Sequence, residues 1–304
     1  NTTVYARLRD ASNNYGASTS IEITVIDKDA PTDVAPAVTS TTTNSLTASG
    51  KQTDALSRIY NIKYQIKKNT DSNWGDLQDS GEFKNLVQNI KYDVRTVATD
   101  CAGNVKESQI TTVTTGEIGA VGTASISPAT WTNGNVTVTL PKSDGFKTMY
   151  TTDGTIPKAT ATGATKEYSN PFTVSSNCTI MFVYTDGNNI NTAGSIIVDK
   201  IDKTAPTNTA PSTTNTTNSI TATNRQADNA GTNEKASGIK TVQYQIKKNA
   251  DTTWGALQST GTFGNLAQNT KYDVRTQVTD NAGNTTTSEI TTVTTGDTKE
   301  ISNI

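Results

Sequence analysis

The chain contains a long internal repeat, which limits what it can fold into more than any other feature. The stretch YQIKKN that begins at Tyr64 returns 180 residues later at Tyr244, and the stretch KYDVRT that begins at Lys91 returns at Lys271. A fixed period of this length is typical of an array of small domains. Such arrays usually provide reach, spacing or repeated contacts rather than one catalytic pocket.

Two kinds of module alternate in this array. Residues 33–116 and 207–297 are two copies of one kind, which we call A1 and A2, and residues 117–206 are a second kind, which we call B. Residues 1–32 match the C-terminal part of a truncated B module. Residues 298–304 match the start of a next module and are expected to be disordered. We therefore predict that the chain is a segment of a longer protein.

Apolar and polar residues alternate along several stretches, which predicts β-strands with one buried face. In A1, Ile62, Tyr64 and Ile66 are expected to point inward and the polar residues between and after them outward. The hydrophobic fraction is only 32%, so we expect thin cores with polar outer faces. The predicted fold class is all-β, with tandem antiparallel β-sandwiches in an elongated array.

The second half of each A module predicts a further strand, a hairpin and a final strand. Residues 92–98 are the strand, with Tyr92, Val94, Thr96 and Ala98 inward. The Gly and Asn of Asp100–Asn104 suit a tight hairpin, and residues 108–115 follow as the final strand. A2 also carries about six extra residues near 228–233, which we expect in a loop.

Three motifs near the end of each A module belong together: KYDVRT, the Asp-x-Ala-Gly-Asn hairpin, and a Thr-rich strand that ends at Gly116 in A1. This combination resembles the second half of a fibronectin type III domain. The resemblance implies that Tyr92 and Tyr272 form tyrosine corners, in which the hydroxyl hydrogen-bonds back to the chain. The A modules depart from the family at residues 47–49, where a buried tryptophan is usual, so their core must be filled differently.

The B module has motifs of its own. A turn at Trp131 leads into a strand with Val136, Val138 and Leu140 inward, and the motifs YTTDGTIP and YSNPF begin at Tyr150 and Tyr168. Together they resemble the small β-sandwich modules similar to the C-terminal domain of chitobiase. Those modules recur in bacterial surface proteins and polysaccharide-degrading enzymes. The resemblance implies an immunoglobulin-like sandwich and supplies no catalytic residue.

Composition argues against several classes of function. The chain has no histidine, which removes the usual general base and the commonest metal ligand. Its 26 basic and 28 acidic residues are scattered, without the basic stripe typical of nucleic-acid binding. No apolar stretch approaches the roughly 18 residues of a membrane span. We predict no enzyme, no cofactor, no nucleic-acid partner and no membrane span, and we expect Cys101 and Cys178, in different modules, to be unpaired thiols.

The connectors ahead of the A modules are acidic. Asp27 and Asp29 precede A1, and Asp199 and Asp202 precede A2. Carboxylates that cluster where two modules meet can share one calcium ion and stiffen the joint. These four aspartates are our candidate metal ligands. The alternative is a polar linker without an ion, because the neighbouring lysines weaken the negative field that calcium needs.

Three tryptophans are candidates for ligand binding. Trp74 and Trp254 occupy the same place in A1 and A2, and Trp131 lies in B. Sugars stack on exposed aromatic faces, so these residues could bind a glycan. The alternative is that a tryptophan repeated in every A copy packs over a thin core.

The resulting hypothesis is a non-catalytic stalk or spacer in an extracellular, adhesin-like bacterial surface protein. Its partners would be the neighbouring modules of the same chain and a surface glycan or protein ligand. The first alternative is a set of carbohydrate-binding or accessory modules of a secreted polysaccharide-degrading enzyme. The second is a component of a phage virion or fibre.

Overall fold

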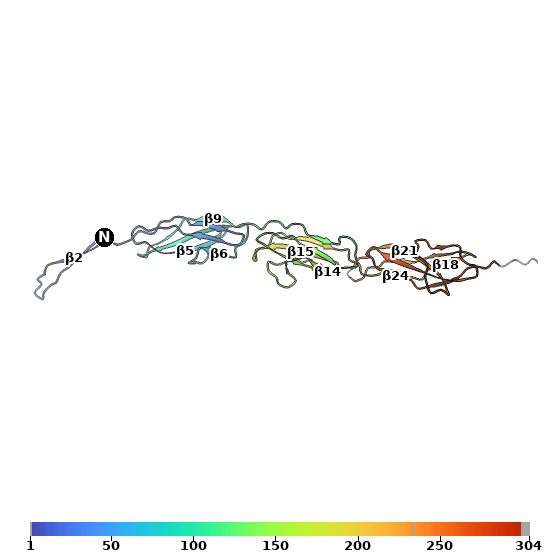
Figure 1. The fold of residues 1–304 in the computed structure, drawn as a ribbon. Coiled ribbons are helices and arrows are strands. Elements are labelled where there is room, and N and C mark those ends of the chain that lie inside the picture. Colours follow the sequence, from blue (N-terminus) through green and yellow to red (C-terminus); the bar gives the residue numbers. More distant parts are fainter. Residues whose placement is uncertain (1, 233, 299–304) are drawn as a thin grey trace, which may run out of the picture. The chain divides into compact units, whose positions relative to one another are not determined.

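The computed structural model describes residues 2–232 and 234–298, and all regular structure there is β-strand (Figure 1). The strands pair in antiparallel ladders, so the predicted all-β class is confirmed. Contacts divide the chain into two units, Asn1–Ala120 with Tyr184–Asn191, and Val121–Val183 with Thr192–Ile304. Of the range 298–304, predicted to be disordered, only Thr298 lies among the described residues. The described ranges hold no helix long and apolar enough to cross a membrane.

The A1 range folds into two sheets that enclose one core. The first sheet has the order β3-β4-β6, and the second has the order β5-β7-β8 with β9 also paired to β7. Side chains of both sheets belong to one buried cluster, so the sheets face each other as a β-sandwich. The strands are β3 (Ala37–Thr41), β4 (Leu46–Ser49), β5 (Ile59–Lys68), β6 (Glu82–Phe83), β7 (Lys91–Asp100), β8 (Val105–Glu107) and β9 (Thr111–Thr114).

Strand β7 has the predicted alternation. Its predicted inward residues are all buried, namely Tyr92, Val94, Thr96 and Ala98. Tyr64 and Ile66 of β5 lie opposite Thr96 and Val94 in the ladder. Because directly opposed residues of antiparallel strands share a face, this register brings Tyr64 and Ile66 to the core side, where they pack against the buried cluster. Leu46 on β4, next to residues 47–49, is fully buried and belongs to this cluster.

Lys67 lies on the outer face of β5, as predicted, but it is largely buried there. Its side chain is only 14% exposed, and its Nζ lies 3.3 Å from Oδ2 of Asp93, whose side chain is 7% exposed. Trp74, in the loop after β5, covers this face, and the guanidinium carbon of Arg95 lies 4.4 Å from the centre of its ring. The outer face of β5 and β7 therefore carries a second, polar layer of packing.

The hairpin after β7 forms as predicted, but the final strand is shorter than predicted. Gly103 has a φ of 93°, which glycine adopts without strain. The predicted strand over residues 108–115 is observed only as β9, and the additional short strand β8 precedes it; both pair with β7. Ser108 lies between β8 and β9, and its hydroxyl accepts the N–H of Thr96 at 2.9 Å. A side chain thus takes the place of a ladder partner between β8 and β9.

The tyrosine corner implied by the family resemblance is present in both A modules. The hydroxyl of Tyr92 accepts the N–H of Val87 at 3.0 Å, and the hydroxyl of Tyr272 accepts the N–H of Ala267 at 3.0 Å. Both tyrosine rings are buried in the core. Each hydrogen bond therefore fixes the loop before the long strand to the core of its module.

Replacing Tyr92 by phenylalanine is expected to destabilise A1 by about 1–2 kcal/mol, because the N–H of Val87 loses its acceptor while the ring still packs. Urea denaturation of the full chain, followed by circular dichroism, measures the change. Tyr60→Phe is the control, since Tyr60 lies on β5 and is 72% exposed. An unfolding transition of Tyr92→Phe that matches the parent would contradict the role of this hydroxyl.

The A2 range repeats the fold of A1. Its sheets have the orders β18-β19-β22 and β21-β23-β24 with β25 also paired to β23, and β17-β20 form a short ladder. The extra residues near 228–233 follow β20 outside any strand, as predicted, with Asn233 outside the described part. The strands are β17 (Thr207–Asn208), β18 (Ser212–Asn215), β19 (Ile220–Thr223), β20 (Gln226–Ala227), β21 (Ile239–Lys248), β22 (Thr262–Phe263), β23 (Lys271–Asp280), β24 (Thr285–Thr287) and β25 (Thr291–Thr294).

The B range has sheets of the orders β10-β11-β14 and β13-β12-β15-β16. Val136, Val138 and Leu140 are buried, as predicted. Tyr150 of β12 stacks on Phe172 of β14 with ring centres 4.3 Å apart, which joins the two sheets. The strands are β10 (Ser125–Ser127), β11 (Val136–Thr139), β12 (Lys147–Thr151), β13 (Lys166–Tyr168), β14 (Phe172–Val174), β15 (Cys178–Thr185) and β16 (Gly194–Val198).

The first strands of the chain form a hairpin. β1 (Thr2–Ala6) and β2 (Thr19–Ile23) pair over five positions, and every residue of both strands is exposed. This hairpin lies within the range predicted as part of a truncated B module.

Candidate metal centres

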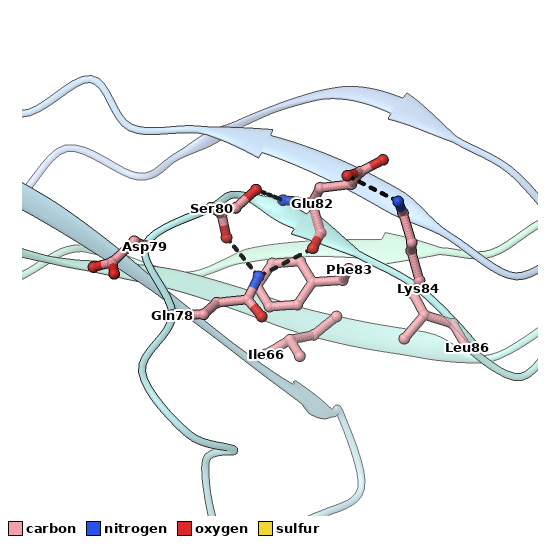
Figure 2. A pocket seen from close by; sticks show the side chains of 8 residues that line it. All are labelled: Ile66, Gln78, Asp79, Ser80, Glu82, Phe83, Lys84 and Leu86. Carbon is pink, nitrogen blue, oxygen red and sulfur yellow. Dashed lines mark hydrogen bonds and ion pairs between the residues drawn. The ribbon is translucent and has the colours of Figure 1, made fainter.

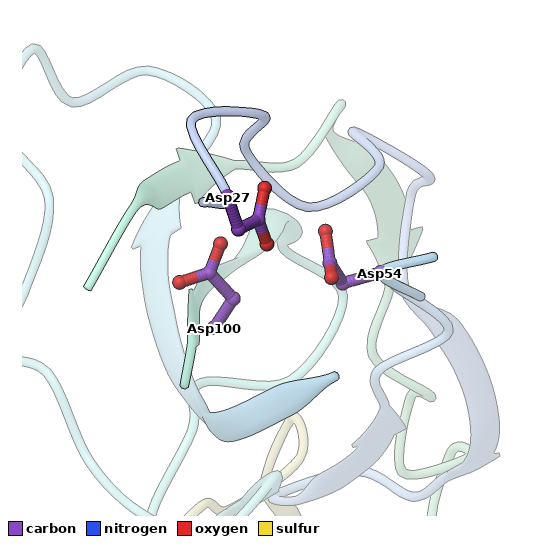
Figure 3. Close-up of side chains that lie close together, drawn as sticks. All are labelled: Asp27, Asp54 and Asp100. Atoms are coloured by element: carbon purple, nitrogen blue, oxygen red, sulfur yellow. The ribbon is translucent and has the colours of Figure 1, made fainter. Parts of the chain in front are cut away.

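Three aspartate carboxylates converge at each A module. One oxygen of each lies within 4.8 Å of the other two. The members come from three corresponding places: the connector before the module, the loop that leads into β5 or β21, and the last residue of β7 or β23. We call them the A1 cluster, Asp27, Asp54 and Asp100 (Figure 3), and the A2 cluster, Asp202, Asp228 and Asp280.

The strand-end members are held by the hairpin that follows them. Asp100 accepts the N–H groups of Ala102 and Asn104 on Oδ1, both at 2.8 Å, and the side-chain amide of Asn104 on Oδ2. Burial by itself raises the pKa of the Asp100 carboxyl, but these hydrogen bonds outweigh it and hold the pKa below its ordinary value. Asp280 is bound in the same way by Gly283 and Asn284. The hairpin of A1 therefore favours the ionised form of Asp100.

The loop members are oriented by backbone N–H groups. Oδ1 of Asp54 accepts three of them, from Leu56, Ser57 and Arg58, at 2.7–3.0 Å. In A2 the extra residues change the loop, and Oδ2 of Asp228 accepts the N–H of Gly238 instead. Two loops of different length thus bring a carboxylate to the same place.

The connector members accept backbone N–H groups on their carboxylates, and the hairpin asparagine binds the carbonyls of each connector. Oδ1 of Asp27 accepts the N–H of Asp29 at 2.9 Å, and Oδ2 of Asp202 accepts the N–H of Ser237 at 2.8 Å. The side-chain amide of Asn104 donates to the carbonyl of Asp29 at 3.2 Å, and that of Asn284 donates to the carbonyl of Asp202 at 2.9 Å. Each connector is therefore fastened to the module that follows it.

The clusters concentrate negative charge without a basic partner. Asp100, Asp202 and Asp280 are buried. In the described part of the chain, no cluster carboxylate forms an ion pair with lysine or arginine. Burial, then the charges of Asp202 and Asp280, raise the pKa of Asp228. Two carboxylate oxygens 4.8 Å apart, the limit of the spacing within each cluster, repel each other by roughly 3 kcal/mol at an effective dielectric constant of about 20.

Two carboxylate oxygens in the clusters also lack hydrogen-bond partners. Oδ2 of Asp27 and Oδ1 of Asp228 each expose less than 1 Å² and accept no hydrogen bond. Buried polar atoms in folded proteins are nearly always paired, so each unpaired one calls for a partner. A donor set of carboxylate oxygens alone suits a hard cation.

Two of the four predicted metal ligands lie in the clusters. Asp27 belongs to the A1 cluster, and Asp202 belongs to the A2 cluster. Asp29 is exposed and donates its N–H to Asp27, and Asp199 forms an ion pair with Lys235 at 2.9 Å. Neither is a member of a cluster.

Sequence reasoning missed the loop and strand-end members. The sequence motif assigns Asp100 and Asp280 to a hairpin turn, and it gives no ligand role to the loop aspartates Asp54 and Asp228. The repeat contains a sequence pattern that identifies these residues, because aligning A1 with A2 places aspartate opposite aspartate at all three cluster positions.

The tryptophans of the A modules lie over basic side chains. Trp74 covers Arg95, and Trp254 covers Arg275, whose guanidinium carbon lies 4.1 Å from the ring centre. Lys67 and Lys247 lie 5.5 Å from the same two rings. Both tryptophans are half-buried, as is Trp131 in the loop before β11. Part of each A-module ring is therefore engaged within its own module.

An open cavity of about 630 Å³ lies beside β6 (Figure 2). Its polar groups bond mainly to one another. The amide of Gln78 donates to the carbonyls of Ser80 and Glu82, and Lys84 pairs with Glu82 at 3.1 Å. This arrangement leaves no convergent set of polar groups for a ligand. The full lining is Ile66, Gln78, Asp79, Ser80, Glu82, Phe83, Lys84 and Leu86.

The two cysteines are free thiols, as predicted. Cys101 is exposed in the hairpin of A1, next to Asp100. Cys178 is half-buried at the start of β15, and burial raises the pKa of its thiol. A raised pKa lowers the thiolate fraction, so Cys178 is a weak nucleophile at neutral pH.

The family described as Fn3 associated matches residues 138–198, which lie in B, whereas the resemblance to fibronectin type III concerned the A modules. No curated protein matches the chain. The FN1–FN3 domains of chicken CNTN1 are 13% identical over 88% of this chain and 100% of that chain, with a TM-score of 0.29. A segment of titin domains is 11% identical over 89% of this chain and 98% of that chain, with a TM-score of 0.40.

Proposed function

We propose that the chain is a non-catalytic stalk or spacer in an adhesin-like, extracellular bacterial surface protein. The observation that carries the proposal is the repeated fastening of each connector to the A module after it. The side-chain amide of Asn104 donates to the carbonyls of Asp27 and Asp29 in the first connector. The amide of Asn284 donates to the carbonyls of the corresponding residues in the second, Asp202 and Thr204. A chain built for spacing needs ordered connectors, because a loose linker would let the modules move independently.

The sandwich cores support the same interpretation. The A1 and A2 cores use corresponding residues in corresponding strands, including the tyrosine corner. Repetition of one core serves an array in which each module contributes length and its own stability. The partners of such a segment are the neighbouring modules of the same chain and a surface glycan or protein ligand.

The accessory-module alternative requires a glycan site at the tryptophans. Trp74 and Trp254 each present a half-buried ring, against which Arg95 and Arg275 lie. We favour the spacer, because the arginine and lysine against each ring are held within the sheet by hydrogen bonds and ion pairs. Arg95 donates to Gln65, and Lys67 pairs with Asp93.

Antibodies raised against the chain test the proposal when they are applied to intact cells of the organism that produces it. We expect labelling of the cell surface without permeabilisation. Labelling of released particles alone would contradict the proposal and favour the virion component. Recovery of the antigen from the medium on insoluble polysaccharide, abolished by Trp74→Ala together with Trp254→Ala, would favour the accessory modules.

A further inference from the structure

We propose that the A1 cluster and the A2 cluster each bind one calcium ion, and that the ion joins the connector to the module that follows. This inference does not depend on the surface role proposed above. It rests on the geometry and the pairing of six aspartates, and it would hold for a spacer, an accessory module or a virion component.

The spacing of the carboxylates fits a single ion. Calcium binds oxygen at about 2.4 Å, so two ligands on opposite sides of one ion are about 4.8 Å apart. In each cluster, three carboxylate oxygens lie within 4.8 Å of one another. A common centre therefore lies within about 2.8 Å of all three oxygens, close to the calcium–oxygen distance. The carboxylates of the A1 cluster come from three separate segments and converge on a common space (Figure 3).

The unpaired oxygens point to a missing partner. The atoms are Oδ2 of Asp27 and Oδ1 of Asp228, both buried and both without a hydrogen bond. The other oxygen of each carboxylate accepts a backbone N–H, which fixes its orientation. The unpaired atom belongs to the connector in A1 and to the loop in A2. The common feature is thus the cluster, rather than one side-chain conformation copied from repeat to repeat.

The chemistry of the clusters favours calcium over other divalent ions. Each consists of carboxylates alone, without the nitrogen or sulfur ligands that zinc and copper prefer. Calcium accepts about six to eight oxygens in irregular geometry, so water and nearby carbonyls can complete its shell. Magnesium requires a regular octahedron of shorter bonds, which three carboxylates fixed by different segments are poorly placed to provide.

The full chain, freed of metal with a chelator, is titrated with calcium chloride by isothermal titration calorimetry. We expect two ions per chain. Saturating calcium should raise the melting temperature by about 5 °C or more, because a ligand that binds only the folded state stabilises it. It should also slow cleavage after Lys28 and Lys203 by a lysine-specific protease, since both residues follow a cluster aspartate. Magnesium chloride at the same concentration should have a smaller effect.

Asparagine variants distinguish an ion site from a structural carboxylate. Asp27→Asn and Asp228→Asn should each remove one ion from the stoichiometry, and together they should abolish the melting shift. In chelator, Asp228→Asn should melt at or above the parent temperature, because the variant removes a buried charge next to two others. Asp29→Asn and Asp199→Asn are the matched controls and should bind two ions.

Calcium binding by the parent chain and by the double variant shows whether the proposal holds. A parent without calcium heat and without a melting shift would overturn the proposal. So would two ions retained by the Asp27→Asn, Asp228→Asn double variant, because binding would then lie elsewhere. A variant that fails to fold is recognised by circular dichroism, and Asp54→Asn in the same A1 cluster then provides the equivalent test.

Discussion

Gly261→Ala is expected to destabilise A2 by about 3 kcal/mol or more, at the upper end of the cost of overfilling a core. A Cβ at Gly261 would lie 2.1 Å from the carbonyl oxygen of Ala222 on β19. That oxygen belongs to the backbone, so no change of rotamer relieves the clash. The carbonyl of Gly261 also accepts the N–H of Ala222 at 2.8 Å, so moving the chain away breaks this hydrogen bond and displaces Phe263 from the core. Gly81 occupies the same place in A1, 1.9 Å from the carbonyl of Ala48.

Urea denaturation followed by circular dichroism measures the loss, and hydrogen exchange of peptides from β19 and β22 places it in A2. Gly264→Ala is the matched control, since a Cβ there meets nothing within 4 Å. The corresponding residue of A1 is Lys84, which shows that this position accepts a side chain. Equal stabilities of Gly261→Ala and Gly264→Ala would show that the contact between Gly261 and β19 is not tight.

The strands of the core could be predicted from the sequence because their signal is local. Period-two alternation identifies the inward residues of β7 and β11, and the structure buries them as expected. The hairpin after β7 follows from one glycine and one asparagine. The break between β8 and β9 could not be predicted in this way, because it depends on the hydroxyl of Ser108 reaching Thr96 on the neighbouring strand.

The acidic clusters depend on contacts between residues far apart in the sequence. Asp27, Asp54 and Asp100 meet only after the sandwich has formed. Alternation and turn propensity describe each of them separately, as a linker, loop or hairpin residue, and carry no information about their mutual distance. Asp29 and Asp199 were equally good candidates in the sequence, and only the folded connector separates them from the cluster members.

The buried ion pair on the outer face could not be predicted for a related reason. Lys67 alternates with apolar residues, and such positions are usually solvated. Here the tryptophan of a following loop covers the face and removes lysine and aspartate from water. The same arrangement recurs in A2, where Nζ of Lys247 lies 2.8 Å from Oδ2 of Asp273.

Asp93→Ala is expected to destabilise A1 by about 3–5 kcal/mol, because it leaves Lys67 buried without its counter-ion. The side chain of Asp93 also accepts hydrogen bonds from Asn69 and Thr112, which the variant removes. Removing both charges in Lys67→Met with Asp93→Ala should cost less than the sum of the single variants, because the second change removes the unpaired charge. Urea denaturation of the four proteins at pH 7 measures this coupling.

An exposed ion pair whose lysine also lies on β5 is the matched control. Nζ of Lys63 lies 3.4 Å from the carboxylate of Asp79, and the two side chains are 41% and 88% exposed. Asp79→Ala should therefore cost less than about 1 kcal/mol. A cost for Asp93→Ala as small as that for Asp79→Ala would show that Lys67 is solvated.

The carboxylate of Asp93 also predicts how the stability of A1 depends on acidic pH. Burial by itself raises the pKa of Asp93, but hydrogen bonds from Thr112, Asn69 and Lys67 outweigh it and lower the pKa from its ordinary value of 3.8. The folded state thus binds the proton less tightly than the unfolded state. The stabilisation from Asp93 is complete above pH 3.8 and is lost as the pH falls through the lowered pKa. The stability gap between the parent and Asp93→Ala should therefore shrink on acidification, whereas a constant gap would mean that the charge of Asp93 contributes nothing.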